Sequence, residues 1–144
     1  MPVRSGDGSQ DGGIRGGNSA TDPVRGTVVL LDDDAWYRQG LRRPLQHEGC
    51  AVFEAEDISS FLRLLETHHV DVVVVDSVLG DNMDGWKEVR AVATRYPGMQ
   101  IVYVSGYDKE SILCFGGTPV ERHYIKGRDG GHAIVQAVID LLRG

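Results

Sequence analysis

Three short runs of β-branched and other apolar residues limit how this chain can fold. They occupy residues 28–31, 71–76 and 101–104, and the second reads DVVVVD, with four valines between two acids. A strand that exposes one face to water alternates apolar and polar residues, whereas a strand buried on both faces is apolar along its length. Buried strands of this kind are typical of parallel sheets covered by helices. Two weaker strand signals, at 51–55 and 122–126, bring the predicted number to five.

The segments between the predicted strands have the spacing of amphipathic helices. Apolar residues recur at intervals of three or four in four segments, 35–48, 58–65, 86–96 and 134–141. Asp is a favoured N-cap residue, and Asp84, Asp108 and Asp129 stand where helices are expected to start, with Asp108 opening a fifth helix. Five strands alternating with five helices predict a single α/β domain. Its architecture would be a doubly wound three-layer sandwich around a five-stranded parallel sheet.

Residues 1–26 differ in composition from the rest of the chain. They are rich in Gly and contain few large apolar residues, so they cannot bury enough surface to offset the entropy lost on ordering. We therefore expect a flexible N-terminal tail over 1–26 and one folded domain over 27–144. The three Arg of the tail balance its three Asp, so the net charge of −6 belongs to the domain.

The charge of the domain argues against several classes of partner. Nucleic-acid-binding surfaces and polybasic membrane patches need clustered positive charge, which an acidic domain does not supply. No apolar run approaches the roughly 18 residues that cross a bilayer. The first residues also lack the apolar core of a secretory signal. We expect a cytoplasmic protein that contacts neither nucleic acid nor membrane.

Polar residues follow four of the predicted strands, at the ends where parallel sheets place their functional crevice. Asp32 and Asp33 follow the first strand, Asp76 ends the third, Ser105 the fourth and Lys126 the fifth. Clustered carboxylates repel one another unless a cation joins them, and Mg²⁺ prefers hard carboxylate oxygens. A carboxylate can attack phosphorus to form an acyl phosphate, while a lysine and a hydroxyl hold the phosphoryl oxygens. These residue types predict phosphoryl transfer assisted by Mg²⁺.

The segments that carry these residues are VVLLDDD, VVVVDSVLGDNMDG, IVYVSGY and HYIKG. In order and spacing they resemble the motifs of response-regulator receiver domains, and the resemblance covers about residues 27–144. It implies that Asp76 is the phosphoacceptor, that Ser105 turns towards the phosphoryl group and that Lys126 pairs with it. His123 stands where the family often has a switching aromatic residue. The implied activity is limited to the domain's own phosphotransfer and dephosphorylation, so the chain would not be an enzyme in the ordinary sense.

The resemblance also implies a metal site and partners. Asp33 and Asp76 would ligate Mg²⁺ directly, Asp32 would act through water, and Val78 would offer its backbone carbonyl. The phosphoryl group would come from a histidine kinase or a phosphotransfer protein. The signal would leave through a downstream protein partner or a fused domain.

Three features depart from the family pattern. Lys126 is followed by Gly127, whereas the family usually has Pro, so we expect a trans peptide bond here. The interval from Asp76 to Asp84 is one residue longer than the commonest spacing, and Gly80 stands where Pro is usual. The sequence CFGGTPVERHY replaces the usual approach to the fifth strand.

Two alternatives remain at the level of sequence. A pseudo-receiver would have the same fold and bind proteins without being phosphorylated, but such domains usually lose the acceptor, the acidic pair or the lysine. A phosphatase of the haloacid-dehalogenase class also uses an aspartate, a serine and a lysine at strand ends. Its Asp-x-Asp motif continues to Thr or Val after one more residue, where this chain has Trp36, and it would have no use for Asp76.

Overall fold

The computed structural model describes residues 25–76, 85–106, 123–127 and 129–144. Within these ranges it contains five strands, β1 (Gly26–Leu31), β2 (Cys50–Ala55), β3 (Val72–Asp76), β4 (Gln100–Ser105) and β5 (His123–Ile125). The helices are α1 (Ala35–His47), α2 (Ile58–Thr67), α3 (Gly85–Ala93) and α5 (Gly131–Arg143). The predicted elements that fall in the described ranges are confirmed, with bounds that differ by at most a few residues.

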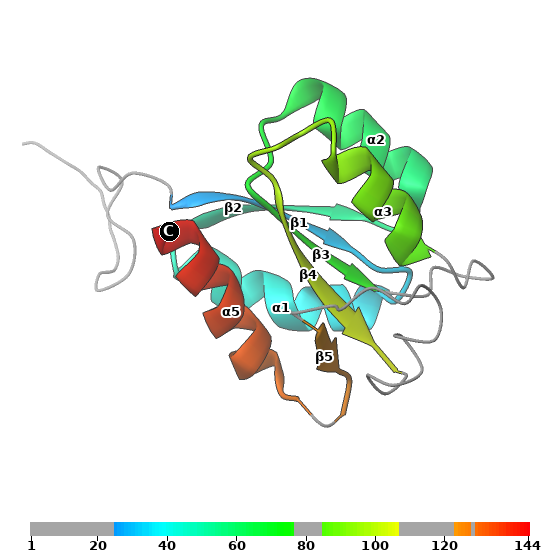
Figure 1. Ribbon diagram of the computed structural model, residues 1–144. Coiled ribbons are helices and arrows are strands. Elements are labelled where there is room, and N and C mark those ends of the chain that lie inside the picture. Colours follow the sequence, from blue (N-terminus) through cyan, green and yellow to red (C-terminus); the bar gives the residue numbers. More distant parts are fainter. Residues whose placement is uncertain (1–24, 77–84, 107–122, 128) are drawn as a thin grey trace, which may run out of the picture.

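The strands form one parallel sheet in the order β2-β1-β3-β4-β5. Helices cover both faces of the sheet, with α1 and α5 on one side and α2 and α3 on the other (Figure 1). This is the predicted doubly wound three-layer sandwich. Because the direction of winding reverses between β1 and β3, the crevice between their carboxyl ends is left open by the helices that follow them.

The valine runs build two separate cores, one on each face of the sheet. Val73 and Val75 of β3 pack with Phe61 of α2, whereas Val72 and Val74 face the opposite layer. All four valines of β3 are almost completely buried. A strand that contributes to both cores has no face left for polar residues, which explains why its sequence is apolar throughout.

One of the predicted helix N-caps is wrong. Helix α5 begins at Gly131, with Gly130 at the N-cap position and no side chain bonded to the exposed amides. The carboxylate of Asp129 instead accepts a hydrogen bond from the backbone N–H of Ile125, at 2.7 Å. The N–H of Asp129 donates to the carbonyl of Ile125 at 2.8 Å. Asp129 therefore closes the turn that carries Lys126, because the short loop brings its carboxylate to the end of β5 rather than to the helix.

Other helix starts follow the expected chemistry. Asp34 caps α1 by accepting from the N–H groups of Trp36 and Tyr37, and Asp57 caps α2 in the same way. The predicted caps at Asp84 and Asp108, and the helix expected after Asp108, lie outside the described residues. None of the helices within the described ranges has the length and apolar character needed to cross a membrane.

Candidate functional site

The acidic and basic residues predicted at the strand ends meet at the carboxyl edge of the sheet. Leu31 of β1 is in register with Val75 of β3, so the residues that follow them, Asp32 and Asp76, emerge side by side. Asp32 is 4% exposed and Asp76 8%. Two carboxylates buried this deeply require a positive partner, because burial without one strongly disfavours their ionised forms.

Lys126 supplies that positive charge. Its ammonium lies 2.9 Å from Oδ2 of Asp32 and donates a hydrogen bond to Oδ2 of Asp76 at 3.1 Å. Burial by itself would lower the pKa of Lys126, but the hydrogen bond to Asp32 and the charges of both carboxylates outweigh burial and hold this pKa above its ordinary value. The lysine is therefore positively charged and bridges the two acids.

Asp33 completes a cluster of three carboxylates. One oxygen from each of Asp32, Asp33 and Asp76 lies within 4.8 Å of the others. The backbone N–H of Asp34 donates to Oδ1 of Asp32 at 2.9 Å, which orients that carboxylate. The cluster carries three formal negative charges against one on Lys126, and its donors are all hard oxygens, so it fits Mg²⁺. Val78, the predicted carbonyl ligand, lies outside the described residues.

An arginine–glutamate network supports the loop that carries the acidic pair. The guanidinium of Arg38, on α1, donates to the backbone carbonyl of Asp32 and to Oε1 of Glu54 on β2, the latter at 2.8 Å. Arg42 binds the other oxygen of Glu54. Partial burial would raise the pKa of Glu54, but its hydrogen bonds to both arginines outweigh that effect and lower the pKa. Our sequence reasoning missed this network, whose only signal is an arginine one helical turn beyond the acids.

Tyr37 is a second residue at the site that sequence reasoning missed. Its ring lies below Lys126, with the ammonium 4.4 Å from the ring centroid. Burial raises the pKa of the Tyr37 phenol to about 12, so the hydroxyl stays neutral. The sequence pattern identified Tyr37 only as an apolar position of α1, because periodicity gives the face of a helix and not the partner above it.

Ser105 and His123 lie on the neighbouring strands β4 and β5. Ser105 is the last residue of β4 and is completely buried, and its carbonyl accepts a hydrogen bond from the N–H of Lys126 at 2.9 Å. His123 opens β5, is paired with Tyr103 of β4 and is 7% exposed. The peptide bond between Lys126 and Gly127 is trans, as expected.

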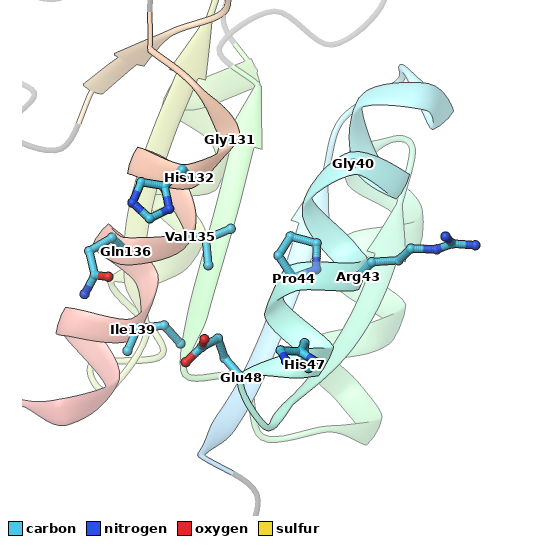
Figure 2. Close-up of a pocket in the computed structure, with 10 residues that line it drawn as sticks. All are labelled: Gly40, Arg43, Pro44, His47, Glu48, Gly131, His132, Val135, Gln136 and Ile139. Atoms are coloured by element: carbon cyan, nitrogen blue, oxygen red, sulfur yellow. The ribbon is translucent and has the colours of Figure 1, made fainter. Parts of the chain in front are cut away.

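A cavity of about 550 Å³ lies away from the acids, between α1 and α5. Figure 2 shows its walls, with Gly40 and Pro44 on α1 facing Gly131 and Val135 on α5. A second, much smaller cavity is bordered by Asp32, Tyr37 and Asp76. Its volume is only about 10 Å³, hardly enough for one water molecule. The acidic cluster thus lies at an edge of the sheet and does not line the cavity between α1 and α5.

The known proteins that resemble this chain include receiver domains and signalling proteins of two-component systems. The model of the response regulator receiver domain family matches residues 28–115. The transcriptional regulatory protein DegU of Brevibacillus brevis is 25% identical over 119 residues, which cover 81% of this chain and 50% of that protein. The sensor kinase CckA of Brucella abortus is 34% identical over 87 residues, which cover 59% of this chain and 9% of that protein. The chain thus spans half the length of the first relative and a small part of the second.

Solved structures have the same architecture. The signal receiver domain of the response regulator NarL from Mycobacterium tuberculosis superposes with a TM-score of 0.70 at 28% identity, covering 85% of this chain and 99% of that domain. A response regulator from Burkholderia pseudomallei, solved with a phosphorylated aspartic acid and a calcium ion, gives a TM-score of 0.65. At 20% identity, over 78% of this chain and 65% of that one, the second comparison shows the fold alone. With a family match over more than half of its length, this chain belongs to the response-regulator receiver domains.

Proposed function

We propose that this receiver domain is phosphorylated on Asp76 as part of two-component signal transduction. The observation that carries the proposal is the contact of the Asp76 carboxylate with Lys126 inside a cluster of three acids. A phosphorylated aspartic acid in the B. pseudomallei neighbour gives a precedent on the same fold. The donor would be a phosphohistidine on a histidine kinase or a phosphotransfer protein.

In the proposed reaction a carboxylate oxygen of Asp76 attacks phosphorus. A P–O bond forms, the P–N bond to the donor histidine breaks, and the imidazole leaves with the electron pair and takes up a proton. Lys126, already within hydrogen-bond distance of Asp76, then pairs with a phosphoryl oxygen. The Ser105 hydroxyl donates to another. Later attack of water on phosphorus breaks the P–O bond to Asp76, releases inorganic phosphate and returns the free carboxylate, so dephosphorylation uses the same residues.

Asp32, Asp33 and Asp76 are the described residues that would hold Mg²⁺, with the carbonyl of Val78 proposed as a further ligand. When bound, the metal supplies positive charge to the phosphoryl oxygens. The protein's own residues arrange the site. The backbone N–H of Asp34 orients the carboxylate of Asp32, and the guanidinium of Arg38 binds the backbone carbonyl of Asp32.

The pseudo-receiver alternative is less well supported. A pseudo-receiver usually lacks the acceptor aspartate, the acidic pair or the lysine. In this structure Lys126 contacts both Asp32 and Asp76. We therefore favour a phosphorylated switch over a binding module that works without phosphorylation.

Intact-protein mass spectrometry tests the proposal. The purified chain is incubated with Mg²⁺ and a small-molecule phosphodonor such as acetyl phosphate. We expect the mass to increase by one phosphoryl group. Hydroxylamine should remove it, because hydroxylamine cleaves acyl phosphates but not the phosphate monoester of phosphoserine. A chain that gains no phosphoryl group at any donor concentration would support the pseudo-receiver alternative instead.

Mg²⁺ should stabilise the folded domain. A ligand that binds only the native state at ten times its dissociation constant adds about 1.4 kcal/mol to the free energy of unfolding. We expect a rise in melting temperature with Mg²⁺ and a much smaller rise for Asp33→Asn. The matched control is Asp34→Asn, because Asn remains a good N-cap and Asp34 is not in the cluster. Equal shifts for Asp33→Asn and wild type would contradict the assigned ligands.

We also propose how the signal leaves the site. Phosphorylation adds about −1.5 to −2 charges at Asp76, and a hydrogen bond from Ser105 would pull the end of β4 inward. His123, on the adjacent strand, would then change its packing and pass the shift to α5. Because His gains less from burial than Tyr or Phe, we expect a smaller shift than the family usually gives.

Amide NMR with beryllofluoride as a phosphoryl mimic tests this route. We expect chemical-shift changes at Ser105, His123 and α5, beyond the loops next to Asp76. Changes confined to those loops would contradict the route. The signal would pass to a protein partner or a fused domain in the cytoplasm. Within the tail predicted over 1–26, residues 1–24 would be dispensable for phosphorylation, whereas Gly26 is the first residue of β1.

A further inference from the structure

We infer that Tyr37 is a positioning residue that aims Lys126 at the phosphorylation site, through contact of its ring face with the lysine ammonium. The inference rests on the proposed function of Lys126. It concerns an aromatic residue on α1 that none of the four receiver-like motifs gives a role. Three observations carry it: the geometry of the contact, the weak restraint on the lysine from its own loop, and the rigidity of the tyrosine.

The Lys126 ammonium is in contact with two carboxylates and one aromatic ring. Two carboxylate oxygens, of Asp32 and Asp76, lie at 2.9 and 3.1 Å, and the Tyr37 ring lies at 4.4 Å from its centroid. A cation within about 6 Å of a ring centroid is attracted by the negative face of the aromatic ring. The ring therefore supports the ammonium from α1 while the acids hold it from β1 and β3.

The loop of Lys126 fixes the backbone but not the direction of the side chain. The N–H of Lys126 is bonded to Ser105, and Asp129 closes the turn. Beyond it, Gly127 has φ of +86°, and a Cβ placed there would meet nothing within 4 Å. No proline ring restrains this step of the chain. A lysine stem has about 2 kcal/mol of rotamer entropy, so contacts near its end must select one direction. The carboxylates of Asp32 and Asp76 supply two of these contacts, and the Tyr37 ring supplies a third from the side of α1.

Tyr37 is itself firmly held. It lies in the first turn of α1, where its N–H donates to the capping carboxylate of Asp34 at 3.2 Å. Its ring packs against the core between α1, α5 and the sheet. Its hydroxyl is buried and has no hydrogen-bond partner among the described residues. The ring, and not the hydroxyl, is therefore the part of Tyr37 that acts on Lys126.

A double-mutant cycle on the full chain tests the inference. Tyr37→Phe keeps the ring and Tyr37→Leu removes it, and each is made with Lys126 or with Lys126→Met. The measurement is the initial rate of labelling by acetyl phosphate at fixed Mg²⁺. With Lys126 present we expect Tyr37→Phe to stay within about twofold of wild type and Tyr37→Leu to be about three- to tenfold slower. In the Lys126→Met background, Tyr37→Leu should cause no further loss.

A purely structural role predicts a different pattern. Tyr37→Leu would then slow labelling equally in both backgrounds, and this result would overturn the inference, as would equal losses for Phe and Leu. If Tyr37→Leu does not fold, as judged by circular dichroism, Tyr37→Met provides a flexible apolar side chain of similar length without a ring.

A second readout does not depend on phosphorylation. The Lys126 ammonium lies 4.4 Å from the Tyr37 ring centroid, so we expect the ring current to displace the NMR signals of the protons on the adjacent carbon upfield. We expect this displacement to persist in Tyr37→Phe and to vanish in Tyr37→Leu. If wild type is never phosphorylated, the proposed function fails while this measurement still decides the position of Lys126. An undisplaced signal in wild type would refute the contact.

Discussion

Replacing Asp76 with Asn should reduce phosphorylation of the chain from one phosphoryl group per molecule to none. An amide has no nucleophilic carboxylate oxygen, so the acyl phosphate cannot form, although Asn has nearly the same shape and can still accept a hydrogen bond from Lys126. Since Asp76 is 8% exposed at the end of the central strand, a substitute of the same size should leave the fold intact. The loss would therefore report chemistry and not unfolding.

Intact-protein mass spectrometry after acetyl phosphate treatment measures this loss directly. Asp34→Asn is the matched control, because it removes a neighbouring carboxylate that lies outside the cluster and should still be labelled fully. A circular dichroism spectrum equal to that of wild type establishes that Asp76→Asn is folded. If Asp76→Asn gains a hydroxylamine-sensitive phosphoryl group at the wild-type rate, another residue is the acceptor.

Replacing Phe61 with Ala should destabilise the domain by about 3–5 kcal/mol. Phe61 is completely buried and joins α2 to β1 and β3 on one face of the sheet. Truncation removes the apolar contact of the ring and leaves a cavity that the closely packed valines cannot fill. Because domains of this size have a total stability of roughly 5–15 kcal/mol, this one change should remove a large share of it.

Urea unfolding gives the measurement. We expect the midpoint to fall with little change in the slope, since the surface exposed on unfolding stays similar. Leu62→Ala, one residue along α2 and only half-buried, is the matched control and should cost much less. A cost at Leu62 equal to or above that at Phe61 would show that the packing of α2 is assigned wrongly.

The fold and the main site residues could be predicted because both depend on local patterns. The valines of β3 required a strand buried on both faces, and a parallel sheet brings strand ends to one edge. These two rules predict that Asp32, Asp76 and Lys126 lie together, and in the structure Lys126 is within hydrogen-bond distance of both acids. Their roles in phosphoryl transfer remain predictions for the experiments above.

The supporting contacts could not be predicted in the same way. Periodicity indicates which side of α1 faces the sheet, but Tyr37 meets Lys126 and Arg38 meets Glu54 only through the angle at which the helix lies. Asp129 was misassigned because an acid before a helix suits both a cap and a turn. The sequence pattern alone does not distinguish a cap from a turn, because the length of the loop decides which backbone N–H groups the carboxylate can reach.

The order of the residues along the chain has a consequence for how the domain is made on the ribosome. The acids of β1 and β3 are synthesised well before Lys126, which follows Asp76 by 50 residues. Until β5 joins the sheet, two neighbouring carboxylates lack their lysine, and their repulsion opposes burial of the strand ends. Docking of β5 thus forms a long-range contact and offsets part of the negative charge of the acids in one step. Contacts between residues far apart in sequence form late, because the chain between them must first be ordered. A nascent chain that stops short of β5 should remain loosened at the edge where phosphorylation is proposed.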